Sequence, residues 1–123
     1  MIFYDFCPGG GCPATSTVTY YLTLTDSFGD GWNGNVLAFR QNNAIQTFTL
    51  SSGYQSGPFA FTFLRLVPVD VIVYTLGTWT GEVGFQLRTY VGTIVAARYS
   101  GSSFSANSKL LSFTPESLNL SPV

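Results

Sequence analysis

The sequence predicts an all-β fold, an antiparallel β-sandwich or jelly roll of about eight strands. Strand-like runs rich in β-branched and aromatic residues recur along the chain, and turn residues separate them. No stretch of about a dozen residues repeats its apolar side chains with the period of a helix. The expected strands span residues 17–25, 36–41, 44–50, 59–67, 69–76, 82–90, 93–99 and 110–113.

Apolar residues alternate in several of these runs, which is typical of strands with one buried face. The alternation puts Val18, Tyr20, Leu22 and Leu24 on one face of the first run and points Val83, Phe85 and Leu87 inward. In segment 59–67, Phe59, Phe61 and Phe63 share one face, which Arg65 would extend. The dipeptide Asn42-Asn43 lies between two such runs and predicts a tight turn, so segments 36–41 and 44–50 are expected to form a hairpin. Segment 51–58, rich in Ser and Gly, is expected to be a loop.

The chain has 123 residues, which fits one domain. We expect a sandwich domain over residues 15–113, an N-terminal extension over 1–14 and a C-terminal tail over 114–123. The two ends either pair with a neighbouring subunit by strand addition or fray in solution.

Charged residues make up only 9% of the chain, whereas ordinary soluble domains carry about 25%. Eleven Phe and seven Tyr exceed what one small core needs. A homo-oligomer or filament, in which another subunit covers part of this surface, is therefore expected; the alternative is a monomer with a Tyr-rich exterior.

The basic residues are few and scattered, so no patch can neutralise several phosphates, and nucleic acid is not an expected partner. No apolar run reaches the about 18 residues of a membrane span, so no membrane insertion is expected. The first six residues lack a basic region and are too few for a signal peptide. The chain is therefore expected either to be a mature or excised piece of a secreted protein or never to have used the secretory route.

Cys7 and Cys12 flank a short Gly-rich loop that could close a local disulfide, and the alternative is two free thiols. A disulfide would favour an oxidising compartment. Asn119 begins an N-glycosylation sequon, although Pro122 follows it and a solvated tail is the plain alternative.

The segment 26–35 combines three glycines with oxygen donors on Asp26, Asp30, Asn33 and Asn35. Calcium prefers six to eight such oxygens, so this loop is a candidate calcium site, although its spacing is not that of an EF-hand. The alternative is a structural turn in which Asp side chains cap backbone N–H groups and Trp32 plugs the end of the sandwich.

The run Asp-Ser-Phe-Gly-Asp-Gly-Trp-Asn-Gly resembles the TDSxGDGWNG signature of secreted repeat modules from marine bacteria, algae and protists. Those modules often carry a second motif, Gly-x-Trp-x-x-Glu, which this chain matches from Gly77 through Trp79 to Glu82. The resemblance covers about residues 17–100 and implies extracellular or cell-surface β-sandwich modules of adhesive or matrix proteins. It brings no catalytic residues, and it suggests that Glu82 approaches the Asp26–Asp30 loop as a further metal ligand.

These observations favour a structural subunit of an extracellular filament, sheath or surface layer. One alternative is a calcium-dependent carbohydrate-binding or adhesion module, in which Trp32 and Trp79 form an exposed stacking platform beside the ion. A second alternative is a small capsid-associated protein of a virion. No enzyme is expected, because the chain has no His as a general base and its clustered acids fit a glycosidase pair poorly.

Overall fold

The computed structural model of the chain describes residues 16–116. The expected Cys7–Cys12 disulfide, the Asn119 glycosylation site and the N-terminal extension lie outside the described residues.

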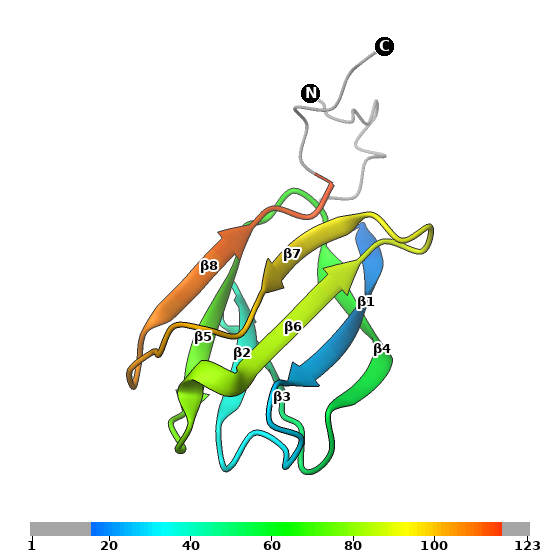
Figure 1. Cartoon of the computed structure of the whole chain (residues 1–123). Helices are drawn as coiled ribbons and strands as arrows, with labels where there is room; N and C mark the ends of the chain where they lie inside the picture. Colours follow the sequence, from blue (N-terminus) through cyan, green and yellow to red (C-terminus); the bar gives the residue numbers. More distant parts are fainter. Residues whose placement is uncertain (1–15, 117–123) are drawn as a thin grey trace, which may run out of the picture.

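Eight strands form two antiparallel sheets of four strands each (Figure 1), which confirms the predicted fold class. One sheet has the order β4-β1-β6-β7 and the other the order β3-β2-β5-β8. The strands are β1 (Thr17–Asp26), β2 (Val36–Gln41), β3 (Ala44–Phe48), β4 (Gln55–Leu64), β5 (Val69–Thr75), β6 (Val83–Arg88), β7 (Ile94–Arg98) and β8 (Lys109–Phe113).

The core lies between the two sheets and is strongly aromatic. Phe39 of β2 contacts the rings of Phe48, Phe61, Phe63 and Phe113 at centroid distances of 4.6 to 6.0 Å. The apolar faces expected for β1 and β6 are buried, because Leu22, Leu24, Val83, Phe85 and Leu87 have almost no exposed surface. On β4, Phe63 is buried in the same way, whereas Phe59 at the other end of the expected face is 43% exposed. The predicted hairpin is also confirmed as β2 and β3.

Most strand boundaries differ from the expected ones by a few residues, and two of the differences have a direct physical reason. Strand β4 begins at Gln55, within the segment expected to be a loop, and it contains Pro58. Proline is tolerated there because β4 is an edge strand, whose outer N–H groups need no partner in the sheet. The expected strand 82–90 starts one residue later, because Thr80–Glu82 forms a 3₁₀ turn (η2) ahead of β6. Within residues 16–116, no helix is long and apolar enough to cross a membrane.

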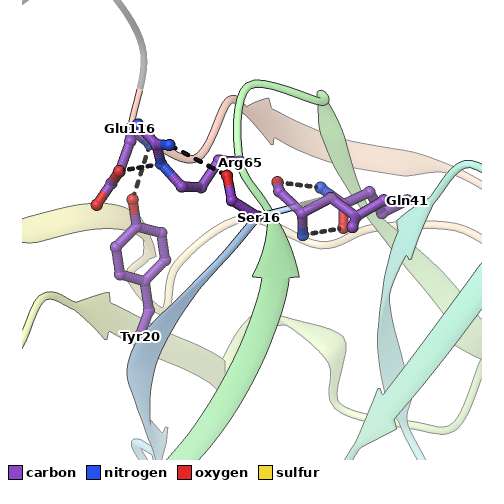
Figure 2. A network of polar contacts seen from close by, with 6 residues as sticks. Ser16, Tyr20, Gln41, Arg65 and Glu116 are labelled. Carbon is purple, nitrogen blue, oxygen red and sulfur yellow. Dashed lines mark hydrogen bonds and ion pairs between the residues drawn. The ribbon is translucent and has the colours of Figure 1, made fainter. Parts of the chain in front are cut away.

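Polar contacts close one end of the sandwich (Figure 2). Arg65 forms an ion pair with Glu116 and donates to Ser16 Oγ at 3.1 Å, while the backbone N–H of Glu116 donates to the Tyr20 hydroxyl at 2.9 Å. These contacts hold residues 114–116, the first part of the expected tail, against the sandwich, and Pro115 among them is buried. The β1–β2 loop lies at the opposite end of the sandwich (Figure 1).

Candidate metal centre

The pairing of β1 with β6 brings the two sequence motifs together. Asp26, the last residue of β1, lies opposite Val83, the first residue of β6, so Glu82 sits beside the start of the β1–β2 loop. One carboxylate oxygen from each of Asp26, Asp30 and Glu82 lies within 4.8 Å of the others. Three of the five predicted ligands therefore converge.

Asp26 is buried and holds the loop that follows it. Its two carboxylate oxygens accept hydrogen bonds from the backbone N–H groups of Phe28 at 3.3 Å and Gly29 at 2.9 Å. Burial by itself would raise the pKa of Asp26, but the hydrogen bonds from Phe28, Glu82, Gly29 and Gly31 lower it below its usual value. The Asp26 carboxylate is thus held in its ionised form.

Glu82 has the opposite electrostatic environment. Burial raises the pKa of Glu82 above its usual value, and the neighbouring carboxyl groups of Asp26 and Asp30 raise it further. Its Oε1 atom is buried and accepts no hydrogen bond. Without a cation, the ionised form of Glu82 is therefore disfavoured by its burial and by repulsion from the other two carboxylates.

Asn33 adds a fourth oxygen at this loop. Its side-chain amide donates to Asp30 Oδ2 at 3.2 Å, whereas its Oδ1 is buried and has no hydrogen-bond partner. Among residues 16–116, the side-chain nitrogen and oxygen atoms that are buried without a partner are Asn33 Oδ1 and Glu82 Oε1. Both belong to the predicted calcium ligand set, and buried oxygens in this state require a partner such as a bound ion or an ordered water.

Asn35 was expected to be a metal ligand, but its side chain is used for other contacts. Its side chain is fully buried, and its amide nitrogen donates to the carbonyls of Trp32 at 2.8 Å and Thr78 at 2.7 Å. Its Oδ1 accepts from the backbone N–H of Gly77 at 2.7 Å. All of its hydrogen-bonding groups are committed to joining the two motif loops, so Asn35 has a structural role and not that of a ligand.

The two tryptophans lie in opposite environments. Trp32 is 0% exposed, and its indole N–H donates to the Thr25 carbonyl at 2.8 Å. The expectation that both indoles form an exposed platform is therefore wrong for Trp32, which plugs the end of the sandwich because its large ring fills the space against Phe48. Trp79 is 67% exposed.

Trp79 and the equally exposed Phe28 form the walls of a pocket of about 330 Å³. Asp30 and Glu82 supply the remaining lining of this pocket. A cation held by these carboxylates would thus be flanked by two aromatic side chains.

Backbone geometry keeps the two motif loops in contact. A Cβ atom added to Gly77 would lie 2.3 Å from the Asn33 carbonyl oxygen, so only glycine permits this approach. Trp79 and Asn33 both adopt positive φ angles near 53°, which is uncommon for residues other than glycine.

Arg98 supports the cluster from β7, and sequence reasoning did not identify it. Its guanidinium donates to the Val83 carbonyl at 3.0 Å and to the Thr80 carbonyl at 3.4 Å, and so fixes the 3₁₀ turn that carries Glu82. The sequence contains no signal for this role, because the contact depends on how β6 and β7 pair.

The donor set fits a hard divalent cation such as calcium. Three carboxylates and one amide oxygen supply several of the six to eight oxygens that calcium takes, and backbone carbonyls or water would complete the shell. The chain matches no known family model, no curated protein and no solved structure.

We predict that Asn35→Ala destabilises the protein by about 2–4 kcal/mol, because it removes three hydrogen bonds of a fully buried side chain to the backbone of Trp32, Gly77 and Thr78 and leaves a cavity in its place. Chemical denaturation measures the loss. The matched control is Asn43→Ala in the exposed β2–β3 turn, which should change the free energy of unfolding by less than about 0.5 kcal/mol. Equal effects of the two substitutions would contradict the structural role of Asn35.

Proposed function

We propose that this chain is a calcium-binding structural module of an extracellular or cell-surface assembly. The observation that carries the proposal is the convergence of Asp26, Asp30 and Glu82, in which Glu82 Oε1 is buried without a hydrogen-bond partner. Asn33, whose amide nitrogen bonds to Asp30, leaves a second buried oxygen without a partner in the same loop. An ion bound there would lock the β1–β2 loop to the 3₁₀ turn.

Charge balance supports a cation at this position. The described part of the chain contains five carboxylates; Asp70 pairs with Arg40 and Lys109, and Glu116 pairs with Arg65. The other three carboxylates gather in the cluster, and no ion pair with a basic side chain is found for them within residues 16–116. A divalent cation would remove the repulsion between them.

The surface supports a role in assembly. Large apolar side chains are exposed on many elements: Phe28, Ile45, Tyr54, Phe59, Tyr74, Leu76, Trp79, Tyr90, Val91, Ile94 and Tyr99. With so few charges around them, these side chains favour association over dispersal in water. Contacts between copies of the module would cover part of this apolar surface.

Calcium is expected to stabilise the folded protein. At a free concentration of about 100 times its dissociation constant, the ion should add about 2.7 kcal/mol to the free energy of unfolding. Calorimetric titration and thermal unfolding with and without calcium measure this. Asp30→Asn and Glu82→Gln should abolish the response, whereas Asp70→Asn, a change of an acid outside the cluster, should retain it. A response that persists in all three variants, or is missing from the native chain, would refute the site.

The stability of the metal-free protein should pass through a maximum with pH. The raised pKa of Glu82 means that the folded state binds its proton more tightly than the unfolded state, so stability is lost as pH rises from 4.5 through that pKa. The lowered pKa of Asp26 means that stability is lost as pH falls from 3.8 through its folded value.

Urea denaturation across this pH range provides the test. Glu82→Gln, or saturating calcium, should remove the loss on the alkaline side and leave the loss on the acid side. An unchanged alkaline loss in Glu82→Gln would show that another group causes it.

The assembled state should depend on the same ion. Light scattering and negative-stain microscopy of the whole chain should show large particles or filaments with calcium and smaller species after chelation. A lone monomer at high concentration under both conditions would contradict the structural role. Assemblies that stay intact after chelation would be consistent with the structural role but would show that calcium is not needed for it.

A second candidate function, calcium-dependent carbohydrate binding, is favoured by the pocket beside the cluster. The exposed Phe28 and Trp79 rings offer faces for a sugar ring next to the carboxylates that would hold the ion. Trp79→Ala distinguishes the two functions, because it would abolish glycan binding at the pocket and leave calcium binding unchanged.

A further inference from the structure

A second hollow lies on the outer face of the sheet β4-β1-β6-β7, away from the carboxylate cluster. It measures about 360 Å³ and is lined by Tyr21, Thr23, Pro58, Arg88, Thr89, Tyr90 and Gly92. Tyr21 pairs with Arg88 five residues along β1 from the Asp26–Val83 pair, which corresponds to about 17 Å. The hollow is therefore separate from the candidate metal centre.

Two tyrosine rings form its apolar wall. The ring of Tyr90 lies 6.3 Å from that of Tyr21 at an angle of 59°, and Tyr90 is 86% exposed. Hydrogen bonds of 2.9 Å from the Thr89 N–H to the Thr93 carbonyl and from the Gly92 N–H to the Thr89 carbonyl shape the turn that carries Tyr90. The ring is thus presented to solvent from an ordered turn.

Arg88 places a fixed positive charge beside these rings. Its guanidinium donates to the Gly92 carbonyl at 3.0 Å and to the Gln86 side-chain oxygen, so it is held in the hollow. Within residues 16–116, Arg88 forms no ion pair, because the described carboxylates lie in the metal cluster or pair with Arg40, Lys109 and Arg65. Its remaining donors suit a carboxylate or sulfate.

The hollow continues along β1. A neighbouring depression of about 410 Å³ shares Thr89 and Tyr90 with it and extends past Thr19 to Glu116. The two depressions on either side of Tyr90 offer room for more than one sugar ring. Glu116 at the far end is ion-paired with Arg65, so the unpaired charge of this surface is that of Arg88.

We propose that this face binds an acidic glycan. A pyranose ring packs on Tyr21 and Tyr90, its carboxylate or sulfate pairs with Arg88, and its hydroxyls bond to Thr23 and Thr89. A single fixed cation beside two aromatic rings matches a sugar that carries one anionic group per ring. It does not match a nucleic acid, whose phosphates need several basic residues.

Calorimetric titration of the whole chain in the presence of a calcium chelator tests the proposal. The probes are alginate oligosaccharides for carboxylates, carrageenan oligosaccharides for sulfates and cellohexaose as a neutral reference. At least one acidic probe should bind, about tenfold more tightly than cellohexaose, and its affinity should fall with salt. The stronger of the two acidic probes identifies the anionic group.

Tyr90→Ala should weaken binding of the acidic probe about tenfold, and Arg88→Gln should remove the preference over cellohexaose. The matched controls are Tyr99→Ala, an exposed tyrosine outside the hollow, and Arg40→Gln on the other sheet; both should bind like the native chain. Circular dichroism of each variant confirms that it is folded.

Failure of both acidic probes to bind, or equal losses in Tyr90→Ala and Tyr99→Ala, would overturn the proposal. So would binding that needs calcium and is lost in Trp79→Ala but not in Tyr90→Ala, since the ligand would then sit at the pocket beside the metal cluster. The acidic-glycan site does not depend on calcium, so loss of the metal site would leave this proposal standing.

Discussion

The register between β1 and β6 is the constraint on which the candidate metal centre depends. Because Asp26 lies opposite Val83, the end of one strand and the start of the other meet at the same edge of the sandwich. A shift of one residue would turn Leu24 and Phe85 out of the core, so burial of the apolar face fixes the register. The packing of the core thereby sets the approach of Glu82 to Asp30.

The loop end of the sandwich combines rigid packing with an electrostatic imbalance. Trp32 and Asn35 anchor the two motif loops through buried hydrogen bonds, which leaves the carboxylates little freedom to move apart. A chain with six acidic residues in all places three of them within 4.8 Å. Burial and the neighbouring carboxyl groups both favour the protonated form of Glu82, so its pKa rises, while the hydrogen-bonded Asp26 remains ionised.

The two proposed binding surfaces use different parts of the same sheet. The metal centre uses the loops at the ends of β1 and β6, where backbone groups converge, whereas the outer hollow uses side chains from the middle of these strands. Successive side chains of β1 point to opposite faces of the sheet. Leu22 and Leu24 therefore pack in the core, while Tyr21 and Thr23 line the outer hollow. The two proposed sites would place an ion at one end of the sandwich and a glycan on the outer face of this sheet.

The sequence alone determined the fold class and the apolar faces of β1 and β6, because period-two alternation and turn residues are local signals. It also put Asp26 and Asp30 in one loop, whereas the approach of Glu82 to them was only implied by the resemblance. Only the tertiary structure decided which motif residues come together at the candidate metal centre and which form its scaffold. In the sequence, nothing distinguishes Trp32 from Trp79 or Asn35 from Asn33. In the structure, Trp32 and Asn35 are buried and hydrogen-bonded. Trp79 is exposed, and the side-chain oxygen of Asn33 has no hydrogen-bond partner. The supporting role of Arg98 and the Tyr21–Tyr90–Arg88 hollow were likewise invisible, because burial and unsatisfied polar groups depend on contacts between strands distant in the sequence.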